Sequence, residues 1–324
     1  MHKRYFVLAA IALFFLGGVV DELRVYQGAQ IAMYVVAISS LILLTGYSGQ
    51  VSLGHGALLA LGGYAAALAR NNWNLNIFLC FVVAIVIAAL GGAILGAAAA
   101  RLSGPYLAGT TLALAVGLPS VANQFSFLGG EQGLLFDAGF PPAAFGADFT
   151  QYRWFFTIAM VVALISTWVL ANLLRSRYGR NWRAVRSNDV AASLAGIKVG
   201  ETKVLAFTVS SGVAGLAGAL LAMTISTVSP SAFPLALSFS LLTGAVLSGV
   251  TTLSGVMIGA VTLVAIPEIA DTIAHRLGGS ESVTNNLPGL LVSSLLILTV
   301  LFVPNGPVEQ LRSARARKEH APRE

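Results

Sequence analysis

The chain has 324 residues, of which 56% are hydrophobic and only 10% carry charge. Soluble domains are about 25% charged, so this composition excludes an ordinary soluble protein and a disordered chain, while the single cysteine excludes a disulfide framework and a thiolate metal site. The formal net charge of +6 would suggest a nucleic-acid partner for a soluble protein, but in membrane proteins basic residues also encode orientation.

Long runs without charge predict consecutive membrane-spanning helices. No Asp, Glu, Lys or Arg occurs in 25–69, 71–100 or 204–267. Because a bilayer core needs about 20 apolar residues per helix, we predict an all-α, polytopic transmembrane helical bundle of about ten spans. The predicted spans are 5–20, 29–44, 52–69, 76–100, 104–122, 153–174, 204–227, 235–252, 254–270 and 287–303.

The first predicted span could be either a helix or a cleaved signal peptide. It is short and follows His2, Lys3 and Arg4, as the apolar core of a signal peptide does. No small-x-small cleavage site clearly follows it, because the glycines and valines of 17–20 lead straight into Asp21. We therefore favour a retained helix.

The basic residues predict which side of the membrane each loop faces. If the N-terminus is cytoplasmic, ten spans place 15 of the 19 Lys and Arg residues on the cytoplasmic side. The positive-inside rule predicts such a split, with both termini cytoplasmic. We accordingly divide the chain into a transmembrane domain, 1–306, and a basic cytoplasmic tail, 307–324. The domain includes an outer loop, 123–152, and an inner loop, 175–203.

The spans contain almost no ionisable groups, which argues against a proton relay or a voltage sensor. No nucleotide-binding motif is found either, since the spacing in 196–203 does not fit a phosphate-binding loop. An apolar pore subunit driven by separate ATPases satisfies both observations. We predict no catalytic residue, no metal site and no nucleic-acid partner, and a tail that touches anionic lipid or only fixes the topology.

The segment 45–56 predicts a broken or re-entrant backbone at membrane depth, because glycines and serines interrupt an apolar run. Such breaks are tolerated where they line a cavity or are buried in protein. Neutral polar groups here would suit an uncharged or zwitterionic solute. The alternative is that the small residues allow close helix packing and that His55 is an ordinary interior histidine. The candidate pathway residues are Tyr47, Ser48, Gly49, Gln50, Ser52 and His55.

The inner loop predicts a short docking helix. Asn188 or Asp189 can cap a helix that runs through Leu194 and ends at Gly196. A small face on this helix could be covered by another protein, and nearby arginines could meet a partner or lipid headgroups. The alternative is that the arginines only enforce topology. The residues of the small face are Ala191, Ala192 and Ala195, and the arginines are Arg183 and Arg186.

Several runs resemble the permeases of branched-chain amino acid ABC importers, and they are most similar to the M-type partner of the heteromeric pair. These runs are TGYSGQVSLGHGALLALGGY at 45–64, GRNWRAVRSNDVAASLAGI at 179–197, AFTVSSGVAGLAGAL at 206–220 and SPSAF at 229–233. IPEI at 266–269 and FVPNG at 302–306 add to the resemblance, which covers most of the chain.

The resemblance implies a multi-pass subunit of the bacterial cytoplasmic (inner) membrane. It would pair with a second permease subunit, two ABC ATPases that bind ATP and Mg, and an extracytoplasmic solute-binding protein. It also implies that the inner loop is a coupling helix that docks on an ATPase, and that 129–134 is an outer-loop element of the family. The coupling positions are then Arg183, Arg186, Asn188, Asp189, Ala191, Ala192 and Gly196.

The chain departs from the family pattern in ways that leave the substrate open. It reads Ser238-Phe239-Ser240 where related permeases commonly have an acidic residue, and 248–253 lacks two glycines that they favour. Branched-chain or other hydrophobic amino acids are the expected cargo, with urea, amides and aromatic or carboxylate solutes as alternatives. From other functional classes, a passive channel and a signalling or scaffold protein remain as rival hypotheses.

Overall fold

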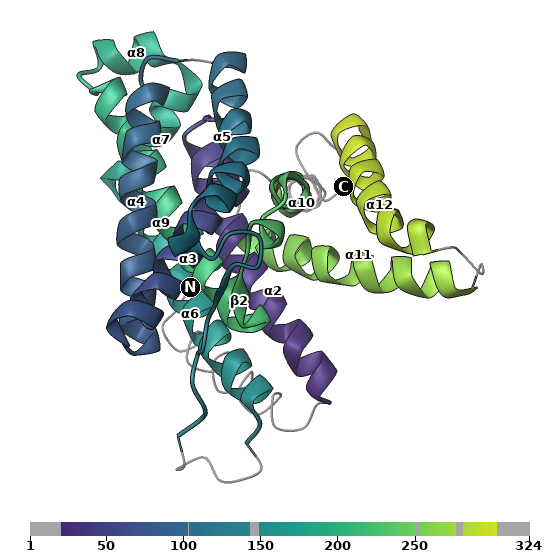
Figure 1. Cartoon of the computed structure of the whole chain (residues 1–324). Coiled ribbons are helices and arrows are strands. Elements are labelled where there is room, and N and C mark those ends of the chain that lie inside the picture. The colour runs from purple at the N-terminus through teal and green to yellow at the C-terminus, as the bar shows by residue number, and fades with distance from the viewer. Residues whose placement is uncertain (1–20, 103, 143–148, 250–252, 277–280, 303–324) are drawn as a thin grey trace, which may run out of the picture.

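The computed structural model describes residues 21–102, 104–142, 149–249, 253–276 and 281–302, which form a helical bundle (Figure 1). Its α-helices are α2 (Glu22–Leu41), α3 (His55–Trp73), α4 (Ile77–Ala99), α5 (Pro105–Gln124), α6 (Gln151–Arg175), α7 (Arg177–Ser187), α8 (Asp189–Leu194), α9 (Val199–Ile225), α10 (Leu235–Ser248), α11 (Val256–Arg276) and α12 (Glu281–Phe302). The shorter elements are a π-helix, η1 (Ile42–Tyr47), the 3-10 turns η2 (Ser126–Leu128), η4 (Pro230–Ala232) and η5 (Leu253–Gly255), and the strands β1 (Leu134–Leu135) and β2 (Thr227–Val228).

The predicted all-α membrane fold is confirmed, because every predicted span from 29–44 onward coincides with a helix. The predicted span 5–20 lies outside the described residues. Within the described part of the chain, seven helices are long and apolar enough to cross a membrane. Helix α3 is not among them, since Arg70 and the following asparagines make its end polar, and the apolar part of α12 is shorter. The count of about ten spans stays a prediction.

The core forms where α9 packs on α2, α3 and α4, while α2 also packs on α6 and α11. One glycine on each helix makes the contact between α9 and α3 possible. A Cβ on Gly62 of α3 would overlap the backbone of Gly215, and a Cβ on Gly218 would overlap the carbonyl of Leu59. Small residues let membrane helices approach this closely. Helices α11 and α12 lean away from the other helices, at the right of Figure 1.

The segment after α5 is fastened to the C-terminal end of α3 and to the segment that follows α9. Strands β1 and β2 pair antiparallel, with Leu134 opposite Val228. The Asn71 side chain donates to the Leu135 carbonyl at 3.0 Å, and Arg70 Nε donates to the Asp137 carbonyl at 2.8 Å. These bonds mark one end of the bundle, and α8 lies at the other end, at the top of Figure 1.

Candidate functional site

The chain unwinds between α2 and α3. The end of α2 widens into η1, and the Ser48 amide bonds the Leu43 carbonyl five residues back at 3.1 Å. Residues 48–54 then form no helix, and Gly49 has a φ of +73°, a left-handed conformation that favours glycine. The predicted broken segment is therefore confirmed. We call residues 48–54 the break.

Two neighbouring helices hold the break where α3 begins. Gly54, the N-cap residue of α3, has no side chain with which to cap the helix. The Ser238 hydroxyl of α10 instead accepts from the Gly56 amide at 2.9 Å, and the Thr111 hydroxyl of α5 accepts from the Leu53 amide at 3.0 Å. Helix α3 thus starts on hydrogen-bond partners that α5 and α10 supply.

His55 and Ser52 are buried in the helix packing, at 0% and 1% exposure. The Ser40 hydroxyl donates its one proton to the Ala37 carbonyl at 2.7 Å. Its oxygen therefore accepts in the 2.7 Å contact with His55 Nε2, and the imidazole N–H is the donor. This bond favours the interior-histidine interpretation of His55. Its Nδ1 atom has no hydrogen-bond partner among the described residues.

The predicted pathway residues Ser48, Gly49 and Gln50 line a cavity of about 610 Å³. Residues between Ala99 and Ala108 form another wall, and the C-terminal part of α7 with the start of α8 forms a third. Tyr47 precedes this group, and the Arg183 guanidinium carbon lies 5.9 Å from the centre of its ring. Three of the six predicted residues therefore meet at one cavity.

Helix α7 anchors the inner loop, and the sequence analysis did not predict it. Gly179, Trp182 and Val185 are all buried. Trp182 Nε1 also donates to the Thr202 carbonyl of α9 at 3.0 Å. The three-residue spacing of these positions puts them on one helix face, and this periodicity was the signal available in the sequence.

The predicted short helix after Asn188 is confirmed as α8. The Asn188 side-chain oxygen accepts from the amides of Val190 and Ala191 at 2.9 and 3.0 Å, as an N-cap does. The helix ends before Gly196, which has a φ of +82°. Capping residues at both ends therefore fix a helix of six residues.

The exposed face of α8 differs from the predicted small face. Ala192 is buried against the chain itself, so only Ala191 and Ala195 of that face are exposed. The large apolar side chains on the outside are Val190 and Leu194, at 68% and 84% exposure. Any partner that covers α8 would meet these two side chains first.

The inner loop contacts the break directly, although the sequence analysis treated them as separate sites. Arg186 Nη1 donates to the Gly46 carbonyl of η1. Gln50 Nε2 lies 3.4 Å from the Lys203 carbonyl, and Lys203 Nζ lies 2.5 Å from the Asp189 carboxylate. A displacement of the inner loop would therefore pull on the backbone of η1 and on the break.

Helix α5 carries an exposed face of mixed polarity that the sequence analysis did not single out. Thr110 and Ser120 are exposed, and a Cβ on Gly109 or Gly117 would meet only open space. Helical periodicity places these four positions toward one side. Tyr106 and Val116 are exposed on the same side, and the Thr110 and Ser120 hydroxyls bond carbonyls of α5 itself. This face of mixed polarity suits a solute path or a protein partner. The signal in the sequence was that α5 is less apolar than most of the other candidate spans.

Known proteins resemble this chain over most of its length. A family model described as "Branched-chain amino acid transport system / permease component" matches residues 25–301. The high-affinity branched-chain amino acid transport system permease protein LivM of Escherichia coli (strain K12) is 28% identical over 320 residues, covering 89% of this chain and 72% of LivM.

Permeases named for other cargo also match. The autoinducer 2 import system permease protein LsrC of Salmonella paratyphi B is 26% identical over 278 residues, covering 79% of this chain and 73% of LsrC. The ribose import permease protein RbsC of Bacillus subtilis is 36% identical over 75 residues, 23% of each chain.

Proposed function

Since the chain belongs to the family of permease components of branched-chain amino acid transport systems, we propose that it is a transmembrane subunit of a bacterial ABC importer. Its partners are a second permease subunit, two ABC ATPases and an extracytoplasmic solute-binding protein. The subunit lies in the cytoplasmic (inner) membrane with both termini inside, and it is not an enzyme. ATP and Mg bind to the ATPases.

The contact between the inner loop and the break supports this proposal most directly. In the proposed complex the ATPase receives α8 in a groove that covers Val190 and Leu194. Arg186 then carries the displacement of the inner loop to the Gly46 carbonyl, and Lys203 carries it to Gln50. This arrangement gives an ATPase mechanical access to the membrane segment through the inner loop.

The proposed cycle is alternating access. ATP binding closes the two ATPases and moves their docked helices, so the two permeases rock and expose a central path to one side and then to the other. The exposed face of α5 and the cavity at the break line this path. Thr111 joins α5 to the break, because its buried hydroxyl accepts from the Leu53 amide.

Branched-chain or other hydrophobic amino acids are the proposed cargo. Ser48 and Gln50 offer neutral donors and acceptors, which suit a zwitterion that must pass without being held tightly. Similarity to LivM over most of the chain supports this choice. Similarity to LsrC and RbsC favours a second class of cargo, solutes other than amino acids, beside the urea, amide and aromatic or carboxylate alternatives.

Reconstitution of the assembled importer in proteoliposomes tests the proposal. We expect leucine uptake that requires ATP and the binding protein, and none through this chain alone. Leucine flux through the isolated chain without ATP would identify a passive channel, and no flux in any assembly would identify a scaffold. A thermal-shift comparison of leucine, urea and benzoate on the cognate binding protein separates the cargo classes.

A further inference from the structure

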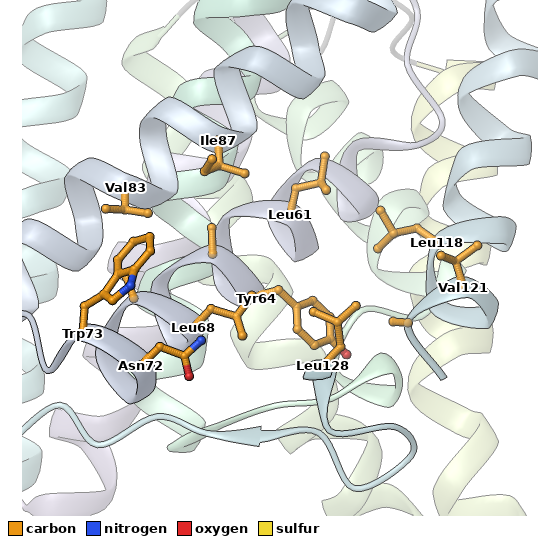
Figure 2. Close-up of a pocket in the computed structure, with 13 residues that line it drawn as sticks. Leu61, Tyr64, Leu68, Asn72, Trp73, Val83, Ile87, Leu118, Val121 and Leu128 are labelled. Carbon is orange, nitrogen blue, oxygen red and sulfur yellow. The ribbon is translucent and has the colours of Figure 1, made fainter. Parts of the chain in front are cut away.

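An apolar groove of about 400 Å³ lies between α4 and α5, with α3 as its floor (Figure 2). The floor residues include Leu61, Tyr64 and Leu68, and Val83 and Ile87 of α4 form one wall. The opposite wall comes from α5 and η2. None of the described side chains that line the groove is charged.

The length of the groove matches one leaflet of a bilayer. At 1.5 Å per residue, α3 rises about 18 Å from Leu61 to Trp73. One leaflet occupies about half of a hydrocarbon core of about 30 Å. With α3 along the membrane normal, the groove extends over the depth that one acyl chain occupies.

The two ends of the groove differ in polarity. Asn72 and Trp73 line one end and are exposed, beside the Arg70 and Asn71 side chains that bond the segment after α5. Tryptophan and polar groups together are typical of the membrane–water interface. At the other end the lining is apolar around Leu61. This polarity fits an amphiphile whose headgroup lies near Asn72 and whose tail follows α3.

The surroundings of the groove indicate that it opens to lipid. The exposed side chains of α4 on the turns around it are large and apolar, among them Val82, Val86 and Leu90. Ile87 on the rim is 42% exposed, so the groove is open on this side. The exposed face of α5 that carries Thr110 and Ser120 is separate from the groove, because neither residue lines it.

We propose that this groove is a binding site for one acyl chain of a membrane phospholipid. The chain lies along α3 between α4 and α5 and keeps α5 apart from α4, and the headgroup lies beside Asn72 and Trp73. Binding uses hydrocarbon contacts and does not require the Tyr64 hydroxyl. The proposal depends on membrane insertion alone, so it stands or falls separately from the proposed cargo and ATPases.

Native mass spectrometry of the full chain tests the proposal. The chain is extracted from membranes of dioleoyl phosphatidylethanolamine and dioleoyl phosphatidylglycerol, and the retained lipid is measured. Ile87→Trp fills the groove from α4 and should lower lipid retention about tenfold. The matched control is Ile94→Trp, two turns along α4, where the side chain is exposed outside the groove and retention should equal that of the natural chain.

A second variant and the partner subunit distinguish lipid from other occupants. Tyr64→Phe removes only a hydroxyl and should retain lipid fully. Equal retention by Ile87→Trp and Ile94→Trp would overturn the proposal. Loss of retention in Tyr64→Phe would also overturn it, because the ligand would then be polar. Displacement of the lipid when the second permease is added would show that a protein occupies the groove.

Discussion

At the scale of single residues, the start of α3 explains a feature that stood out in the sequence. Ser238-Phe239-Ser240 replaces a motif with an acidic residue in related permeases, which suggested altered cargo. In the structure Ser238 is buried, and its hydroxyl accepts from the Gly56 amide. The N-cap residue Gly54 has no side chain that could accept this hydrogen bond. Ser238 therefore has a structural role at the start of α3.

Ser238→Ala should destabilise the chain by about 1–3 kcal/mol, because the buried Gly56 amide loses its partner. The midpoint of thermal unfolding of the purified chain in detergent measures the effect. Ser240→Ala, half-buried two residues along the same helix, is the control and should leave the midpoint nearly unchanged. Equal midpoints for the two variants would contradict the capping role.

The Asp189–Lys203 ion pair allows a test of what α8 needs for docking. Asp189→Lys should weaken ATPase association by about tenfold, or about 1.4 kcal/mol, because two positive charges then face each other. The double variant Asp189→Lys with Lys203→Asp restores an ion pair and should restore association, as measured by co-purification. Continued loss in the double variant would mean that the Asp189 carboxylate itself contacts the ATPase.

At the scale of elements, the spans were predictable because long apolar runs identify membrane helices from composition alone. The break was predictable too, since Gly46 and Gly49 interrupt such a run. Helix α7 was not predicted, because five arginines dominate the composition of the inner loop and only a few apolar residues mark the buried face. Trp182 is the anchor of that face. The face of α8 was predicted wrongly for Ala192, because capping residues fix where a helix begins and ends but not which side it buries.

Close packing of α3 on α9 makes a further prediction. Gly62→Ala should destabilise the chain by about 1–3 kcal/mol, because its Cβ would overlap the backbone of Gly215. Gly109→Ala on α5 is the matched control, because its Cβ meets open space and alanine is the better helix former. The yield of folded monomer after mild heating in detergent compares them. A loss for Gly109→Ala as large as for Gly62→Ala would contradict the packing explanation.

At the scale of the whole molecule, the arrangement of the two candidate sites was beyond the sequence. The inner loop and the break are separated by more than a hundred residues, and the Arg186–Gly46 bond depends on how α7 folds back beside η1. Composition and charge predict the side on which a loop lies, and they do not predict which loops touch. Contact between distant segments comes from packing, which one sequence does not reveal.

The predicted orientation can be checked with single cysteines. Cys80 is buried, so it should give little background labelling. A membrane-impermeant maleimide added to intact spheroplasts should label Leu135→Cys and leave Leu194→Cys unlabelled, and permeabilisation should expose the second site. Both wild-type side chains are highly exposed, and they belong to the predicted outer and inner loops, so each controls for the other. Labelling in the reverse order would invert the topology.

The π-helix η1 has a mechanical consequence. A π-helical turn contains one residue more than an α-helical turn, so η1 holds an extra residue compared with an α-helix of the same length. Tightening η1 to α-geometry would release that residue and swing the downstream chain by about 100° and ~1.5 Å. Arg186 bonds the Gly46 carbonyl, so the inner loop is attached to the element that would tighten. A small displacement of the inner loop that tightens η1 would therefore rotate Ser48 and Gln50 through a large angle without moving α2.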